Sequence, residues 1–259
     1  MSGSLCMSGL PHAAHALVTG GGRGIGRAIA GALKRAGATV TILGRTAATL
    51  DEAVAAGDAD YAAVADVADQ AALSAAIAAA AGRQPIDILI ANAGSAESAP
   101  FLKSDAALFR RMIDINVMGV VHAVQAVLPG LKGRPYGRIV AIASTAGLKG
   151  YAYVSAYTAA KHAVVGLTRA LALELAATGI TVNAVCPGFT DTDLVAGSID
   201  TIMKKTGRSR EQAVAELASH NPQGRLVSPR EVADTVLWLC GEGASAVTGQ
   251  AIVVAGGEI

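Results

Sequence analysis

Two residues with the chemistry of proton transfer, Tyr157 and Lys161, lie four positions apart in the segment SAYTAAK. On a helix this spacing places both side chains on one face. A neighbouring ammonium group favours the phenolate, so we expect Lys161 to lower the pKa of Tyr157 toward the range in which a phenol exchanges a proton with an alcohol or ketone. Ser144 follows the apolar run RIVAIA, where its hydroxyl could bond a substrate oxygen. A Tyr and a Lys at this spacing are usually surface residues, but Ser144 favours a proton-transfer site.

A second chemical signal is the glycine-rich stretch TGGGRGIG at 19–26, which directly follows the first apolar run. Glycines permit positive φ angles and a close approach of the backbone to a pyrophosphate, and a helix that follows directs its N-terminal amides at the negative charge. Alone, a glycine cluster is often a plain tight turn, but between a first strand and a first helix it predicts a dinucleotide site. The residues expected to contact the dinucleotide are Gly20, Gly22, Arg23, Gly24, Ile25 and Gly26.

The segment after the second predicted strand bears on the choice between NAD and NADP. An NAD-preferring enzyme usually carries an acidic residue about 20 residues after the glycine loop. This chain has Gly44-Arg45-Thr46 there, and no acid precedes Asp51. Arg45 and Arg23 could together hold a 2′-phosphate, since a guanidinium group matches phosphate geometry. NADP(H) is therefore favoured and NAD(H) stays open, because both arginines could also be ordinary solvated side chains.

These residues depend on elements that alternate along the chain. Apolar runs predict strands, and alanine-rich stretches between them predict helices. Strands of this kind, separated by helices, require a mostly parallel sheet covered on both faces. We predict an α/β fold with a seven-stranded sheet in a single doubly wound Rossmann-type domain over 14–259. The expected strands are 15–19, 39–43, 60–64, 86–91, 138–143, 180–185 and 251–255, and the expected helices are near 25–37, 47–56, 69–82, 105–131, 155–178 and 229–241.

Two segments stand outside this alternation. Residues 1–13 lack the basic start and long apolar stretch of a signal peptide, so we expect a flexible leader. Residues 189–225 are longer than an ordinary loop, and we expect them to form a lid over the carboxyl ends of the strands. The lid carries basic residues that would suit a phosphorylated substrate or would merely be solvated: Lys204, Lys205, Arg208 and Arg210.

Composition excludes several classes of protein. With 52% hydrophobic residues, 30 glycines and 3% aromatic residues, the chain suits helices packed closely on a sheet and not a disordered protein. A net charge of +1 gives no reason to expect nucleic acid or a membrane surface as a partner, and no apolar stretch predicts a membrane span. Neither the scattered histidines nor Cys6, Cys186 and Cys240 have metal-ligand spacing, so we expect no metal site and reduced thiols in a cytoplasmic protein.

Taken together, the motifs resemble the short-chain dehydrogenase/reductase family, from Ala14 to Gly257. One departure is Ala91, where the family often has an asparagine. The residues that carry the likeness are the glycine stretch, Asp66, Val67, Asn92, Ala93, Gly94, Asn116, Ser144, Tyr157, Lys161, Pro187, Gly188, Thr190 and Thr192.

The resemblance implies a role for several of these residues. Asn116 would hold a water in a proton relay with Lys161, which would also bond the nicotinamide ribose. Asp66 would bond the adenine, and Thr192 would meet the carboxamide. The turn Asn92-Ala93-Gly94 would support the central sheet and border the cofactor. A homotetramer is also implied, built from the helices near 105–131 and 155–178 and the C-terminal strand.

The catalytic half looks most like ketoreductases that act on 3-oxoacyl thioesters, so the expected reaction is reduction of such a thioester, carried by CoA or an acyl carrier protein. The alternative is a catabolic NAD-dependent dehydrogenase of a 3-hydroxyacyl-CoA or a cyclic secondary alcohol. A non-catalytic nucleotide-binding regulatory protein is least expected, because it has no need of the complete catalytic set. Neighbourhood alone suggests pocket residues: Ser95, Ala146, Tyr151, Tyr153 and Leu194.

Overall fold

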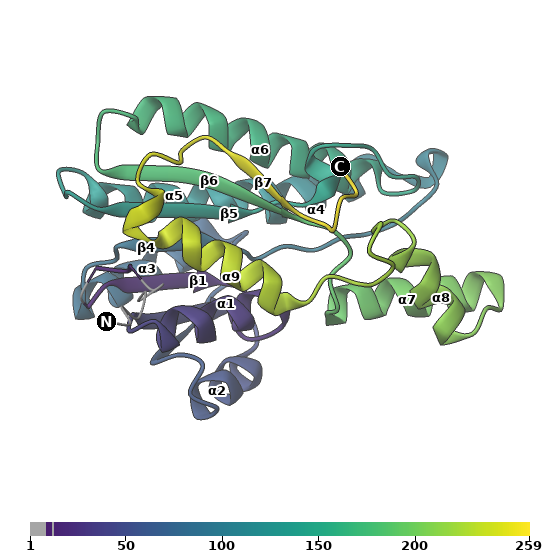
Figure 1. The fold of residues 1–259 in the computed structure, drawn as a ribbon, viewed down its shortest axis with the longest axis horizontal. Coiled ribbons are helices and arrows are strands. Elements are labelled where there is room, and N and C mark those ends of the chain that lie inside the picture. Colours follow the sequence, from purple (N-terminus) through teal and green to yellow (C-terminus); the bar gives the residue numbers. More distant parts are fainter. Residues whose placement is uncertain (1–8, 12) are drawn as a thin grey trace, which may run out of the picture.

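The computed structural model describes residues 9–11 and 13–259. In this part of the chain seven strands form one parallel sheet in the order β3-β2-β1-β4-β5-β6-β7 (Figure 1). Successive strands run outward from β1 to β3, and β4 then pairs with the other side of β1. This reversal is the switch point where doubly wound sheets bind ligands. The strands are β1 His15–Thr19, β2 Thr39–Gly44, β3 Tyr61–Val64, β4 Ile88–Ala91, β5 Gly137–Ile142, β6 Ile180–Pro187 and β7 Ala251–Val254.

Helices cover both faces of the sheet, as the doubly wound prediction requires. Helices α1 (Gly24–Arg35), α2 (Ala47–Ala55) and α9 (Pro229–Cys240) pack on one face. The opposite face is covered by α3 (Gln70–Arg83), α5 (Gly119–Leu131) and α6 (Ser155–Leu175). The predicted α/β fold is confirmed, and the sheet is wholly parallel among the described strands.

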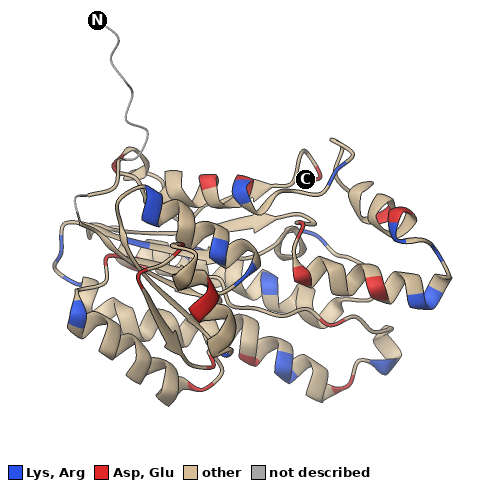
Figure 2. Cartoon of the chain, turned by 90° about the horizontal axis from the view of Figure 1, so that it is seen from below, with Lys and Arg blue, Asp and Glu red and all other residues tan. Residues whose placement is uncertain are grey.

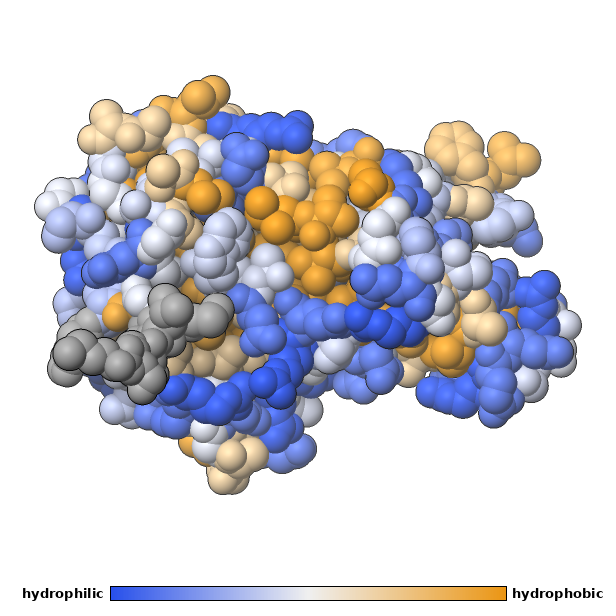
Figure 3. All heavy atoms as spheres, in the orientation of Figure 1, coloured by the Kyte–Doolittle hydropathy of each residue, from blue (hydrophilic) through white to orange (hydrophobic). Residues whose placement is uncertain are grey.

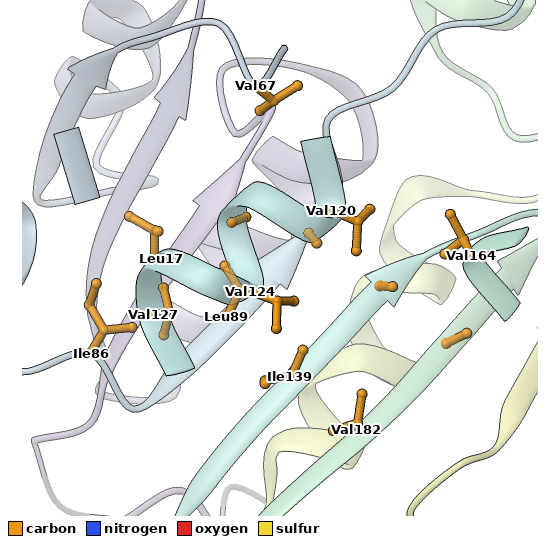
Figure 4. Packing of buried hydrophobic residues seen from close by; sticks show 14 of the residues in the cluster. Leu17, Val67, Ile86, Leu89, Val120, Val124, Val127, Ile139, Val164 and Val182 are labelled. Carbon is orange, nitrogen blue, oxygen red and sulfur yellow. The ribbon is translucent and has the colours of Figure 1, made fainter. Parts of the chain in front are cut away.

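The core consists of aliphatic side chains that alternate between these faces. Leu17 points into the cluster under α5, while Val18 belongs to the cluster under α1 and α9. Figure 4 shows Val120, Val124 and Val127 of α5 directed toward the strands. Burial of each such side chain stabilises the fold by roughly 1.5–3 kcal/mol. Because both faces of the central strands are buried, their sequences are apolar without interruption.

The helix predicted over 105–131 runs without a break from Ala106 to Leu131, but it is not α-helical throughout. Helix α4 (Ala106–Ile113) is separated from α5 by a π-helical turn over Asp114–Met118. The side-chain amide of Asn116 donates to the carbonyl of Met112 at 3.0 Å, which competes with the regular helical pattern. By length and composition the span Ala106–Leu131 could cross a membrane, but α5 packs its apolar side chains against the sheet and α4 packs its own against α6, as in the core of a folded domain.

The predicted lid consists of two helices, α7 (Asp193–Thr206) and α8 (Arg210–Ala218), which project from one end of the domain (Figure 1). They pack through a small apolar cluster that includes Val195, Ile199 and Leu217. The lid is joined to the domain at a narrow neck. There Val227 donates its backbone amide to Phe189 and accepts one from Asp191, both at 2.9 Å.

Most of the predicted flexible leader, including Cys6, lies outside the described residues. Its described part contacts the domain. The carbonyl of Gly9 accepts the amide of Glu242 at 2.9 Å, and Leu10 packs against the cluster that contains α9.

Candidate active site

The carboxyl ends of the central strands open into a cavity of about 770 Å³. Residues from the glycine loop, the segment after β4, the end of β5, α6 and the first turns of α7 line it. The structure therefore places the predicted catalytic and cofactor-binding residues around one space. Those residues are Gly20, Gly22, Arg23, Gly24, Ile25, Gly26, Arg45, Asp66, Val67, Asn92, Ala93, Gly94, Asn116, Ser144, Tyr157, Lys161, Pro187, Gly188, Thr190 and Thr192.

The glycine loop is a cradle that side chains cannot enter. Gly20 has a φ of +66°, a conformation that L residues rarely adopt. A Cβ atom on Gly26 would lie 2.2 Å from the Gly20 carbonyl and 2.5 Å from Nδ2 of Asn92. The first turn of α1 can therefore approach the loop closely. Its free amides then face the cavity, where they suit a negatively charged phosphate group.

Thr19 and Asn92 fix this loop to the end of β4. The Thr19 hydroxyl accepts the backbone amides of Asn92 and Ala93, each at 3.0 Å. In return, Nδ2 of Asn92 donates to the carbonyls of Thr19 and Gly20, at 2.9 and 3.2 Å. Ala91, the departure from the family pattern, is buried in the core and leaves these bonds intact. The sequence indicated Thr19 only as the start of the glycine stretch.

Lys161 lies at the buried end of the catalytic group. It is 4% exposed, and its ammonium donates to the Ile142 carbonyl at 2.8 Å. Burial lowers the pKa of Lys161 to about 8. The ammonium lies 5.7 Å from the ring centre of Tyr157, as expected for positions four apart on α6. Nothing in the sequence could reveal the Ile142 carbonyl as the partner, because that contact depends on how α6 packs against β5.

The expected lowering of the pKa of Tyr157 is wrong. Burial raises the pKa of Tyr157, and a hydrogen bond from Ser144 offsets only part of that rise. The nearby thiol of Cys186 also raises the pKa of Tyr157. Burial raises the pKa of that thiol to about 11. Ser144 also accepts the Ala146 amide at 3.1 Å, which orients its hydroxyl at the end of β5.

Asn116 connects the π-helical turn to this group. Its side chain is fully buried, and Nδ2 donates to the carbonyls of Ser95 and Met112 at 3.0 Å. A Cβ on Gly94 would lie 2.8 Å from Oδ1 of Asn116 and 3.5 Å from the Lys161 ammonium. Only glycine at position 94 lets the backbone lie this close to the Asn116 side chain and the Lys161 ammonium. Single-turn π-helical segments of this kind are frequent at functional sites.

At the other end of the cavity, the two arginines expected to hold a 2′-phosphate each lie near a carboxylate. Arg23 is 3.7 Å from Asp193 at the start of α7, and Arg45 is 3.8 Å from Asp66. These side chains are largely exposed, so each ion pair is weak. Both arginines line the cavity, and a bound 2′-phosphate would compete with Asp193 for Arg23 and with Asp66 for Arg45.

The basic residues of the lid lie outside the cavity. Arg208 pairs with Glu216, and Arg210 lies 3.6 Å from Asp200. Figure 2 shows basic and acidic residues close together on these helices. This arrangement indicates that the basic residues of the lid are ordinary solvated side chains and not a site for a phosphorylated substrate. Of the residues suggested by neighbourhood, the cavity is lined by Ser95 and Leu194 and not by Ala146, Tyr151 or Tyr153.

Comparisons with known proteins identify the family. The family model described as short chain dehydrogenase matches residues 14–217. The chain belongs to the short-chain dehydrogenase family. Its members are oxidoreductases that bind NAD(P), so the chain is an oxidoreductase and the predicted family is confirmed.

Among relatives of this short-chain dehydrogenase is the "Putative ketoacyl reductase" of Streptomyces coelicolor, 41% identical over 93% of this chain and 95% of the relative. The cis-4-hydroxycyclohexanecarboxylate dehydrogenase of Sinomonas cyclohexanicum is 39% identical over 93% of this chain and 95% of its own length. A crystal structure of a variant of actinorhodin polyketide ketoreductase with NADPH is 39% identical, with a TM-score of 0.90, and covers 95% of this chain and 97% of that one.

Proposed function

We propose that this short-chain dehydrogenase is an NADPH-dependent ketoreductase that reduces the 3-oxo group of an acyl thioester to a 3-hydroxy group. The observation that carries the proposal is the single cavity, which joins the glycine cradle to Ser144, Tyr157 and Lys161. Similarity to a ketoacyl reductase and a polyketide ketoreductase supports the substrate class. The thioester would be carried by CoA or by an acyl carrier protein.

The cavity residues fit a nicotinamide dinucleotide. The cradle at Gly20 and Gly26 admits no side chain, and the amides at the start of α1 would hold the pyrophosphate. Asp66 would contact the adenine, Lys161 the nicotinamide ribose and Thr192 the carboxamide. When bound, the cofactor supplies a hydride to the carbonyl carbon of the substrate.

The chain itself supplies the proton and stabilises the charge. Tyr157 donates its phenolic proton to the carbonyl oxygen as negative charge develops there, and the Ser144 hydroxyl donates a hydrogen bond to the same oxygen. The Lys161 ammonium stabilises the resulting tyrosinate. Asn116, fixed against Ser95, would hold a water that returns a proton to this group.

Arg23 and Arg45 support the choice of NADP over NAD, because both line the cavity near the glycine cradle. The residue directly after β2 is Arg45 and not the acidic residue typical of NAD-preferring enzymes. A second candidate is oxidation of a cyclic secondary alcohol or 3-hydroxyacyl-CoA with NAD. The proximity of Asp66 to Arg45 and of Asp193 to Arg23 favours it, since these carboxylates oppose a phosphate. Similarity to a cyclohexanecarboxylate dehydrogenase agrees with this alternative.

Absorbance at 340 nm with acetoacetyl-CoA as substrate, measured in parallel with NADPH and NADH, tests the proposal. Faster oxidation of NADPH is the expected result. A clear preference for NADH would contradict the cofactor assignment and favour the dehydrogenase. Turnover with other ketones but none with acetoacetyl-CoA would contradict the thioester assignment.

We also propose a homotetramer. The outer strand β7 keeps all four of its apolar residues partly exposed, and Leu173 of α6 is 81% exposed. Figure 3 shows an apolar surface in the region of β7. Association through this edge would cover it. The cytoplasmic location stays a prediction from the sequence.

A further inference from the structure

A carboxylate that the sequence analysis did not single out lies buried beside the lid. The side chain of Glu258, in the segment after β7, is only 2% exposed. Its Oε1 atom accepts a hydrogen bond from the Tyr151 hydroxyl and lies 3.1 Å from the Lys149 ammonium. Nδ1 of His220 lies 3.9 Å from the same oxygen. Burial of a carboxylate is costly, and these polar partners offset that cost.

Glu258 lies where the two ends of the lid meet. A Cβ on Gly188, just before the lid, would be 3.0 Å from Oε2 of Glu258. His220 follows α8 at the other end of the lid. Next to it, a Cβ on Gly256 would be 1.9 Å from Oδ1 of Asn221, so the segment after β7 packs tightly on the returning chain. The Glu258 carboxylate therefore lies beside Gly188 and His220, at the two ends of the segment that carries α7 and α8, and we call these two ends the hinges of the lid.

Tyr151 extends these contacts to the catalytic group. Its ring packs edge-on against Phe189 and His220, each at 5.8 Å between centres. Its hydroxyl is 2.6 Å from the hydroxyl of Thr145, the residue that follows Ser144. Burial raises the pKa of Tyr151, and the bond to Glu258 raises it further, so the phenol remains a donor to that carboxylate.

We propose that Glu258 is a positioning residue, which holds Tyr151 and both hinges of the lid so that the substrate side of the cavity keeps one shape. This inference rests on the proposed function, because it assigns Glu258 to the binding of the carbonyl substrate. Gly188 and the start of α7 line the cavity, so a shift of this hinge would change the shape of the space that the substrate occupies. The glycine cradle and Lys161 have their own supports, at Asn92 and Ile142, and do not depend on Glu258.

The test compares Glu258→Gln with Glu242→Gln, the same change at an exposed position outside the cavity. The glutamine keeps the shape but places an amide donor beside the Lys149 ammonium and removes the buried charge. We expect KM for acetoacetyl-CoA to rise about ten- to hundredfold, the range for loss of a hydrogen bond to a charged group. kcat and the Kd of NADPH should stay within about twofold, and Glu242→Gln should match the wild type.

A second readout does not require turnover. Hydrogen exchange of the NADPH-bound protein should become faster over 188–222 and 145–153 in Glu258→Gln and remain unchanged in β1 and β4. Glu258→Asp, which keeps the charge, should restore most of the protection. If Glu258→Gln does not fold, Tyr151→Phe removes only the hydroxyl and should raise KM in the same way.

Unchanged lid exchange together with an unchanged KM would overturn the proposal. So would a parallel loss of NADPH affinity and sheet protection that Glu258→Asp fails to restore, since that pattern marks a merely structural role. If the wild type turns over no 3-oxoacyl thioester, the proposed function fails, and the exchange measurement still decides whether Glu258 holds the lid.

Discussion

The closest approach in the glycine cradle leads to a prediction in which a usually favourable substitution becomes unfavourable. Alanine in place of glycine within a helix stabilises a protein by about 1 kcal/mol. At position 26 the new Cβ would lie 2.2 Å from the Gly20 carbonyl, where real contacts stay above 3.0 Å, so 3.0 − 2.2 gives a required shift of at least 0.8 Å. Such overpacking costs about 1–3 kcal/mol, which cancels or exceeds the helical gain.

We therefore expect Gly26→Ala to lower the free energy of unfolding by about 1–3 kcal/mol relative to the same change at an open helical site, where only the helical gain operates. Gly82 of α3 is that matched control, because a Cβ there meets nothing within 4 Å. The displaced Gly20 lines the cavity, so the Kd of NADPH should rise about tenfold in Gly26→Ala and remain unchanged in Gly82→Ala. Denaturant unfolding and fluorescence titration measure the two quantities. Equal stability and equal NADPH affinity in the two variants would refute the close-packing argument.

Three further predictions concern the catalytic and cofactor residues. Tyr157→Phe should lower kcat by about 10²- to 10⁴-fold in the 340 nm assay with the Kd of NADPH unchanged, and retained turnover would exclude Tyr157 as the proton donor. Lys161 has its folded pKa lowered from 10.5 to about 8, so the unfolded chain binds more protons between these values and stability should rise with pH there. The gain relative to Lys161→Met should approach about 3 kcal/mol by pH 10.5, and parallel pH profiles of the two proteins would show that Lys161 is not desolvated. In fluorescence titrations Arg45→Ala should raise the Kd of NADPH about tenfold and leave the Kd of NADH nearly unchanged. An equal effect on both cofactors would show that Arg45 does not bind the 2′-phosphate.

The strands could be predicted closely because their signal is local. β1 begins and ends where the apolar run HALVT does, and the other strands differ from prediction by at most two residues at either end. Continuous apolar character follows directly from burial on both faces of a parallel sheet. The glycine stretch likewise lies at a strand-to-helix junction that can be located from the sequence.

The π-helical turn could not be predicted, since it depends on contacts between Asn116 and Ser95, 21 residues apart. The same limit applies to the electrostatics of Tyr157. Spacing on α6 indicated that Lys161 shares a helix face with Tyr157, but the pKa shifts of both groups follow chiefly from burial, which only packing determines. Glu258 carries no signal in sequence because its partners come from separate segments.

The narrow neck of the lid affects how this chain could acquire new substrates. The segment between Asp191 and Val227 leaves and re-enters the domain through adjacent backbone hydrogen bonds, so its ends stay together whatever lies between them. The entropy of closing a loop grows only with the logarithm of its length, about 0.6 kcal/mol for each doubling. Insertions or replacements in α7 and α8 are therefore thermodynamically inexpensive for the sheet. Substrate preference in such a protein can diverge by exchange of one peripheral segment, while the predicted proton-transfer residues after β5 and on α6 keep their places.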